Sequence, residues 1–337
     1  MERHEGGWLY DGQACQRLWN KSAIGRPLGE KILLTPAEVV FCHEHRHLNW
    51  PHDDWLREAA EESPQLLEEA VVVESLMVPG NRLVTHQNFE SLELSSAEST
   101  WGLRWTSESH PRTDKPVAEV RWYHASEQLD VEDLFIWSEL VSDKGRIPEI
   151  LVVDDEHAVV TYRVGRVEPE GSMGSPSVDG LQCIANLEVT HLDSGGRFIV
   201  GFEKWSEDRI GVPHPEGRVL DPCTSQMLDS LDDPENSTMG AEILLDLLER
   251  GLHPRPGFKY GTRWRCYDRP LGEGHAPWLV VHPAEAPSDW GGACLASRLA
   301  SGVGKTWLHP LQRDGGWRYL SITRPPADSR WSNPSRR

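Results

Sequence analysis

The chain has 337 residues, of which 38% are hydrophobic, and a formal net charge of −19 at pH 7. This length is enough for two or more domains with buried cores. No apolar run approaches the length of a membrane span, and the N-terminal MERHEGGWLYDG lacks an apolar signal-peptide core. We therefore expect a cytoplasmic protein without a membrane segment. Six scattered cysteines contain no CxxC pair, which argues against a zinc ribbon and a disulfide framework.

The acidic charge also bears on possible partners. Most nucleic-acid-binding proteins carry a basic surface, so the net charge alone counts against RNA or DNA. A global charge does not exclude a local basic cleft, however. Whether the chain binds nucleic acid must therefore be inferred from its local motifs and not from its net charge.

Near the N-terminus, Thr35-Pro36-Ala37-Glu38 predicts the start of a helix. Thr and Glu three residues apart form a capping box, and proline is favoured at the first helical position. The helix is expected to continue through Phe41 into His43-Glu44-His45-Arg46-His47.

This histidine-rich end matches H-E-x-x-H, the zinc-protease motif. On a helix, His43 and His47 lie one turn apart and could share a metal, with Glu44 as a base. Polar residues fill the two positions between Glu44 and His47, no clear third ligand follows, and Pro51 ends the helix soon afterwards. A solvated helix end is the favoured interpretation, and a zinc metallopeptidase is kept as an alternative function.

Residues 53–78 are acidic and helical in pattern, interrupted at Pro64. Val120–Tyr123 is expected to be a strand, and Asp130 to cap a helix that ends near Val141. A hairpin is expected around the acidic tip Asp154-Asp155-Glu156. Residues 167–180 are rich in Gly, Ser and Pro and indicate a domain linker.

The C-terminal part carries the strongest pattern. Ala241–Arg250 has a helical apolar stripe, Gly251 is placed to end the helix, and two prolines follow. The aromatic-rich run Phe258–Tyr267 predicts a strand. A strand ending at Tyr267 would put its hydroxyl at a sheet edge, where a loop could bring His275 to it.

This stretch resembles archaeal-type tRNA-splicing endonucleases, in which a helix ending in RG leads to GFKFG..FRVY; here the residues are GFKYGTRWRCY from Gly257. The segment Lys31–Glu38 resembles the family's L.LsP.Ea segment. The resemblance implies an active site of Tyr267, His275 and Lys305, without metal or cofactor. The loop before His275 is shorter than usual, which leaves His282 as a second candidate.

The implied reaction is attack of a 2′-OH on the adjacent phosphate of precursor tRNA. Tyr267 would act as base, His275 as acid and Lys305 as electrostatic stabiliser, giving a 2′,3′-cyclic phosphate and a 5′-OH. A free tyrosine has a pKa of about 10, so Tyr267 could position the 2′-OH more than deprotonate it. The resemblance further implies that Arg298 and a second arginine, Arg324 or otherwise Arg318, hold a bulged base.

The two halves of the chain align without a gap at an offset of 159 residues, so that Trp101 falls on Tyr260. The first copy has Glu108, Pro116 and Arg146 where the second has the implied active-site residues. This pattern resembles the fused, homodimeric form of the endonuclease, whose first half is non-catalytic. In that form the acidic tip Asp154–Glu156 would insert into a basic pocket of a second copy.

We therefore expect an α/β (α+β) protein that cuts precursor tRNA at bulge–helix–bulge splice sites as a homodimer. It would be a tandem repeat of a small α+β N-terminal domain and a mixed-sheet α/β endonuclease domain, with the first copy degenerate. A structured-RNA-binding scaffold without catalysis is a further alternative. The expected parts are an N-terminal domain at 1–78, a nuclease-like pseudo-subunit at 79–166, a linker at 167–180, a second N-terminal-type domain at 181–240, the catalytic domain at 241–326 and a basic flexible tail at 327–337.

Overall fold

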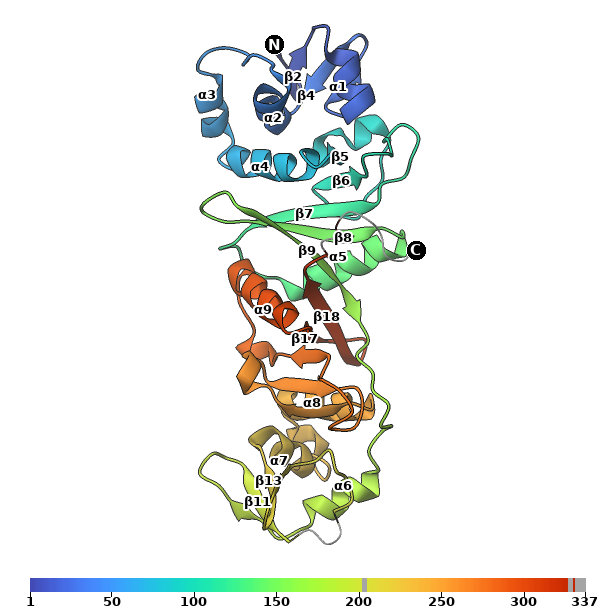
Figure 1. Ribbon diagram of the computed structural model, residues 1–337, viewed down its shortest axis with the longest axis vertical. Helices are drawn as coiled ribbons and strands as arrows, with labels where there is room; N and C mark the ends of the chain where they lie inside the picture. Colours follow the sequence, from blue (N-terminus) through green and yellow to red (C-terminus); the bar gives the residue numbers. More distant parts are fainter. Residues whose placement is uncertain (202–204, 327–329, 331–337) are drawn as a thin grey trace. The chain divides into compact units, whose positions relative to one another are not determined.

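The computed structural model describes residues 1–201, 205–326 and 330 (Figure 1). The predicted tail at 327–337 therefore lies outside the described residues, except for Arg330. The chain divides into two compact units. Unit 1 comprises Met1–Gly165, Pro287–Cys294 and Ile322–Arg337, and unit 2 comprises Arg166–Ala286 and Leu295–Ser321.

Unit 1 begins with a four-stranded antiparallel sheet in the order β1-β2-β4-β3, packed with helices. The predicted capping box is present: the Thr35 side chain accepts from the Glu38 amide, and the Glu38 carboxylate accepts from the Thr35 amide at 2.9 Å. Proline 64 separates two helices, as predicted. The elements are β1 (Glu2–His4), β2 (Gly7–Tyr10), α1 (Cys15–Ser22), β3 (Arg26–Leu28), β4 (Lys31–Leu34), α2 (Pro36–Arg46), α3 (Trp55–Glu62) and α4 (Leu66–Met77).

The rest of unit 1 is a mixed ladder in the order β9-β8-β7-β6-β5. Strands β7 and β8 are parallel and are connected by helix α5, whose N-terminus is capped by Asp130 as predicted. The other pairs are antiparallel. The elements are β5 (Arg82–Thr85), η1 (His86–Asn88), η2 (Glu90–Leu92), β6 (Gly102–Trp105), β7 (Ala118–His124), α5 (Val131–Asp143), β8 (Ile147–Val153) and β9 (Val159–Val167).

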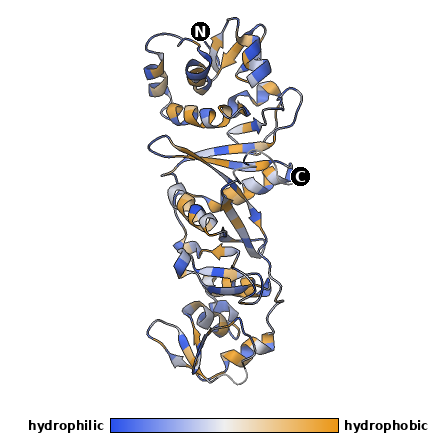
Figure 2. Cartoon of the chain, in the orientation of Figure 1, coloured by the Kyte–Doolittle hydropathy of each residue, from blue (hydrophilic) through white to orange (hydrophobic). Residues whose placement is uncertain are grey.

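Unit 2 also begins with a four-stranded antiparallel sheet, in the order β10-β11-β13-β12, with helices beside it. Most apolar residues of α8, like most of those of α4, lie in hydrophobic cores, although Met239 and Leu67 are exposed. Figure 2 colours these helices by the hydropathy of each residue. The elements are α6 (Val178–Ala185), β10 (Thr190–His191), β11 (Arg197–Val200), β12 (Val212–His214), β13 (Gly217–Leu220), α7 (Pro222–Asp229), η3 (Pro234–Asn236) and α8 (Met239–Glu249).

The second ladder of unit 2 has the order β14-β15-β16-β17-β18. Strands β16 and β17 are parallel, with α9 between them in the chain, and the other printed pairs are antiparallel. Each unit thus contains a ladder with the same order of strands and a helix at the same place. The elements are β14 (His253–Pro256), η4 (Phe258–Tyr260), β15 (Trp264–Tyr267), β16 (Trp278–Val280), η5 (Pro283–Glu285), α9 (Trp290–Gly302), β17 (Thr306–Arg313) and β18 (Gly316–Thr323).

One prediction in this region was wrong. Residues Phe258–Tyr260 form a 3-10 turn, and only Trp264–Tyr267 of the expected strand is extended. The turn closes at Gly261, which has φ of +65°, a conformation that glycine adopts without strain. Helix α8 ends as predicted, with Gly251 at φ of +74°.

The segment that precedes α6 is held against the end of α8. Gly171 donates its N–H to the Arg250 carbonyl at 2.9 Å, and Ser172 donates to the carbonyl of Asp268 at 2.8 Å. A Cβ atom at Gly171 would lie 2.1 Å from the Gly251 oxygen, so this crossing requires glycine. Across the described residues, we found no helix with the length and apolarity needed to span a membrane.

Candidate active site

Tyr267 is the last residue of β15, a strand with one buried face. Trp264 and Cys266 point into the core, whereas Arg265 and Tyr267 are half-buried on the other face. The Arg265 guanidinium carbon lies 5.8 Å from the centre of the Tyr267 ring. His253 is directly opposite Tyr267 on β14, with 6.4 Å between the ring centres. The phenol is therefore flanked by a cation and an imidazole.

His275 lies in the loop between β15 and β16 and is exposed. The next residue, Ala276, is buried. The imidazole is therefore at the surface, while burial of Ala276 holds the backbone in place directly after His275.

Lys305 lies between α9 and β17 and is half-buried. Its ammonium donates to the carbonyl of Ala276, next to His275, and stands 5.4 Å from the centre of the Tyr260 ring. Thr306 donates its N–H to the Pro277 carbonyl at 2.9 Å. Lys305 is thus bonded to the β15–β16 loop, which contains His275.

The strand register relates the three predicted residues. Strands β15 and β16 align Cys266 with Trp278, so Tyr267 comes beside Pro277. Strands β16 and β17 align Trp278 with Thr306, so Lys305 comes beside Pro277 from the other side. Neighbouring strands are about 4.8 Å apart, which puts the Tyr267 and Lys305 backbones about 10 Å apart at one end of the ladder. His275 enters this end two residues before Pro277.

The sequence did not single out the positive charge around Tyr267. Arg255 pairs with Arg265 across β14 and β15 and is buried. Burial, followed by Arg255 and Arg209, lowers the pKa of His253 to about 4, so its imidazole is neutral at pH 7. The alternation of His253 and Arg255 just after the C-terminal glycine of α8 was the available signal. The prolines at 254 and 256 made a strand at this place difficult to predict.

The arginines predicted to grip a base are both at the surface. Arg298 is exposed on α9, and Arg324 is exposed just after β18. Arg318, the alternative to Arg324, donates to the Trp317 carbonyl at 3.2 Å and is half-buried. The second candidate histidine, His282, accepts from the Ala284 amide at 3.2 Å and begins the turn η5.

Unit 2 contains a cavity of about 340 Å³ beside β14 and the start of β15. Arg209, Arg255 and Arg263 line it, together with two carboxylates. Arg263 is the most accessible of these cations, at 33% side-chain exposure, and lies 3.5 Å from Glu285. Phe258 stands at the cavity with 95% of its surface exposed, which is exceptional for a phenylalanine. The cavity is basic and has an uncovered apolar rim.

The acidic tip of the β8–β9 hairpin is exposed. The Asp154 carboxylate accepts from the backbone amides of Glu156 and Ala158 at 3.0 and 2.8 Å, and so shapes the turn. Asp155 is 96% exposed and lies 3.4 Å from His124. Glu156 is also exposed, so Asp155 and Glu156 present their charges to solvent.

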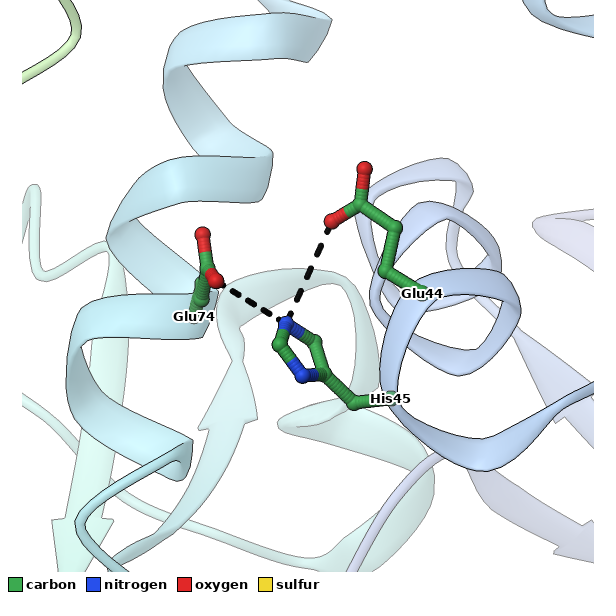
Figure 3. Close-up of side chains that lie close together, drawn as sticks. All are labelled: Glu44, His45 and Glu74. Carbon is green, nitrogen blue, oxygen red and sulfur yellow. Dashed lines mark hydrogen bonds and ion pairs between the residues drawn. The ribbon is translucent and has the colours of Figure 1, made fainter.

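The H-E-x-x-H pattern does not assemble a zinc-protease site. Helix α2 ends at Arg46, and His47 is its C-cap with φ of +59°, so the two histidines are not on one helical face. His43 donates its Nδ1–H to the Leu48 carbonyl and stacks on Trp50, with 3.8 Å between the ring centres. Among the described residues, the group with metal-ligand spacing is Glu44, His45 and Glu74 instead, in which His45 Nε2 lies 2.9 Å from Glu74 (Figure 3).

Comparison of the sequence with known proteins finds clear relatives. Residues 242–319 match the family described as tRNA intron endonuclease, catalytic C-terminal domain. A tRNA-splicing endonuclease from Methanococcoides burtonii is 23% identical over 94% of this chain and 96% of its own length. The chain is thus similar to archaeal-type tRNA-splicing endonucleases over nearly its whole length, and its C-terminal part to their catalytic domain.

Other members of the tRNA-splicing endonuclease family match shorter regions. One from Thermoplasma volcanium is 29% identical over 51% of this chain and 53% of its own length. One from Natronomonas pharaonis is 40% identical over 23% of this chain and 25% of its own length. The chain thus spans about half the length of the Thermoplasma relative and nearly all of the Methanococcoides one. The family segment contains Tyr267, His275 and Lys305, and ends before Arg324.

Proposed function

We propose that this chain is an endoribonuclease that excises introns from precursor tRNA by cutting at bulge–helix–bulge splice sites. The observation that carries the proposal is the register of β15, β16 and β17. It brings Tyr267 and Lys305 to either side of Pro277, beside the loop of His275, within the segment that matches the catalytic domain.

The chemistry follows from these three side chains. The 2′-oxygen of the nucleotide before the cut attacks the adjacent phosphorus, and the bond from phosphorus to the 5′-oxygen breaks. Tyr267 orients or deprotonates the 2′-OH, and His275 gives a proton to the departing 5′-oxygen. The Lys305 ammonium stabilises the charge on the phosphorane. The products are a 2′,3′-cyclic phosphate and a 5′-OH, and no cofactor enters the step.

Positive charge near Tyr267 favours this role for the phenol. Arg265 lies beside the ring, and Arg255 is opposite Arg265 in the ladder. These positive charges attract the phosphate of an RNA substrate to the phenol. Lys305 is already held by a carbonyl, so little side-chain freedom is lost when it meets the substrate.

Substrate recognition is assigned to exposed arginines of two chains. Arg298 on α9 of one chain and Arg324 after β18 of a second copy would stack on a bulged base, with Arg318 as the alternative to Arg324. Planar guanidinium groups suit this task because they stack and donate hydrogen bonds at the same time. Bulged bases are the accessible part of a folded RNA, since the major groove of A-form RNA is too narrow for side chains.

We further propose that the chain is a tandem repeat that works as a homodimer. The ladders of the two units share one strand order, which supports a duplicated unit with a degenerate first copy. The acidic tip Asp154–Glu156 would dock in the arginine-lined cavity of a second copy and cover the Phe258 ring. Opposite charge gives this contact its orientation, and burial of the ring contributes its hydrophobic part.

The test uses a labelled precursor tRNA with a bulge–helix–bulge, in excess EDTA. The wild type is expected to make two cuts that leave cyclic phosphate, and His275→Ala to cut at least 100-fold more slowly. His282→Ala is the matched control and should cut normally. If His282→Ala loses activity and His275→Ala keeps it, the assignment of the acid is wrong. Binding of the RNA without cleavage would instead make the chain a scaffold.

A further inference from the structure

Unit 1 contains a cavity of about 390 Å³ beside the end of β7, between α4 and α5. Its walls include three half-buried aromatic side chains, Trp101, Trp122 and Tyr123. The Tyr123 ring is stacked on Trp290 at 4.7 Å, which fixes its plane. The volume lies in the range of small-molecule sites.

The one arginine that lines this cavity is already engaged. Arg121 donates to the Asp133 carboxylate and, at 3.2 Å, to the Glu98 carbonyl. Its guanidinium carbon lies 4.7 Å from the centre of the Trp137 ring. The charges of Arg121 and Asp133 therefore neutralise each other.

Two further carboxylates of the cavity wall have no such partner. Within the described part of the chain, neither Glu69 nor Glu127 makes a salt bridge; they accept from Trp101 Nε1 at 3.2 Å and from the His124 amide at 2.6 Å. Burial is the main cause that raises the pKa of Glu69, and nearby His86 lowers it only in part. Glu69 is half-buried, and a half-buried carboxylate without a cation is costly, so a bound cation would remove this cost; Glu127 is exposed at the mouth of the cavity.

We propose that this cavity binds a linear aliphatic polyamine, with an ammonium group on Glu69, a second on Glu127 and the methylene chain against the tryptophan rings. Aromatic faces attract ammonium groups, and they also pack well against methylenes. Both features of the wall, the aromatic rings and the unpaired carboxylates, match this one ligand class.

The cavity of unit 2 provides an internal contrast. It lies beside α8 and the first two strands of its ladder, β14 and β15, whereas the unit 1 cavity lies beside α4 and the third strand, β7. Its lining is arginine-rich, however, whereas the lining in unit 1 offers aromatic rings and unpaired carboxylates. The two cavities are thus suited to ligands of opposite charge.

The experiment titrates the full chain with spermidine by isothermal calorimetry at 150 mM NaCl, with no RNA present. Wild type is expected to bind one spermidine per chain. Glu69→Gln should weaken binding at least 10-fold and Trp122→Leu at least 5-fold. Glu108→Gln, an exposed acid of the same unit outside the cavity, should leave binding unchanged. Thermal melts identify a variant that fails to fold, and Glu127→Gln then replaces it.

Three outcomes would overturn the proposal. The first is no saturable binding. The second is equal weakening by Glu69→Gln and Glu108→Gln, which would mean diffuse counterion binding to a chain of net charge −19. The third outcome combines two results: the wild type does not bind spermidine, and Glu69→Gln elutes at a different volume from the wild type in size-exclusion chromatography. This outcome would mean that a basic side chain of a second copy fills the cavity. Because RNA cleavage is not measured, the result is independent of the proposed endonuclease activity.

Discussion

The ammonium of Lys305 is bonded to the carbonyl of Ala276, the residue that follows His275, although 29 residues separate the two in sequence. This bond couples the proposed stabilising cation to the loop of the proposed acid. Lys305→Met should therefore remove the positive charge and also loosen the loop. We expect cleavage of precursor tRNA to fall by about 100- to 1,000-fold, the usual effect of losing one transition-state donor.

The measurement for Lys305 is a single-turnover cleavage assay with enzyme in excess. Lys305→Arg keeps a cationic donor and should retain more activity than Lys305→Met. Arg313→Met, at the far end of β17, is the control for general loss of charge. If Lys305→Met cuts within threefold of wild type, Lys305 has no part in the chemistry.

The proposed docking of the acidic tip makes a prediction about charge reversal. Asp155→Arg combined with Glu156→Arg should weaken the homodimer at least 10-fold, since both side chains would then face the arginine-lined cavity. Arg263→Glu should do the same from the cavity side. A chain that carries both changes should regain much of the affinity, as measured by analytical ultracentrifugation. Weakening by each change without any recovery would argue against direct pairing.

The buried ion pair of unit 1 predicts a large stability effect. Arg104 binds Glu149 through two hydrogen bonds of 2.6 Å, and both side chains are completely buried. Glu149→Gln leaves a buried guanidinium without its counter-charge, so the free energy of unfolding should fall by about 3–5 kcal/mol in urea titrations. The exposed pair Arg57–Glu61 is the comparison, and Glu61→Gln should leave the free energy of unfolding nearly unchanged, because solvent screens this pair. Equal costs for the two variants would contradict this account.

His253, which lies opposite Tyr267, predicts how stability depends on pH. The pKa of His253 is lowered to about 4 in the folded chain, against about 6.5 when unfolded. Between these values the unfolded state binds more protons, so stability should rise with pH across this window and be lost as pH falls from 6.5 towards 4. The pKa of His309 is also lowered to about 4 in the folded chain, and burial is the main cause.

The test compares urea unfolding of wild type and His253→Gln at pH 7 and pH 4.5. The variant should lose less stability on acidification than wild type does, by about 1–2 kcal/mol. His191→Gln, at an exposed position of β10, should behave as wild type. A His253→Gln variant with an unchanged acid sensitivity would show that other groups control this transition.

Much of the fold could be predicted because short sequence motifs specify where several helices begin and end. The Thr35 cap, the Asp130 cap and the glycine after α8 each have one local cause, and each was confirmed. Strand β14 was missed because His253-Pro254-Arg255-Pro256 carries two prolines, which sheets accept only at an edge, and β14 is the end strand of its ladder. The strand expected from Phe258 begins only at Trp264, because Gly257 and Gly261 frame a 3-10 turn that overrides the strand preference of the aromatic residues.

The candidate site was predictable only in part. The matched segment covers Tyr267, His275 and Lys305, whose roles stay predictions, but their neighbours come from other elements. Arg255 meets Arg265 only because two strands pair, and Arg121 meets Asp133 only because α5 returns over the ladder. Contacts between such distant residues depend on register, which a single sequence does not specify.

The crossing of Gly171 and Gly251 has a practical consequence for anyone who wishes to cut the chain into two separately expressed halves. Residues 171–173 look like a flexible connection in the sequence, yet they are bonded to Arg250, Gly251 and Asp268, and the last of these follows Tyr267 directly. A new terminus placed after this segment would leave the proposed base at the end of a strand that has lost a neighbour. A cleavage point upstream of Gly171 would keep the segment with the half that needs it.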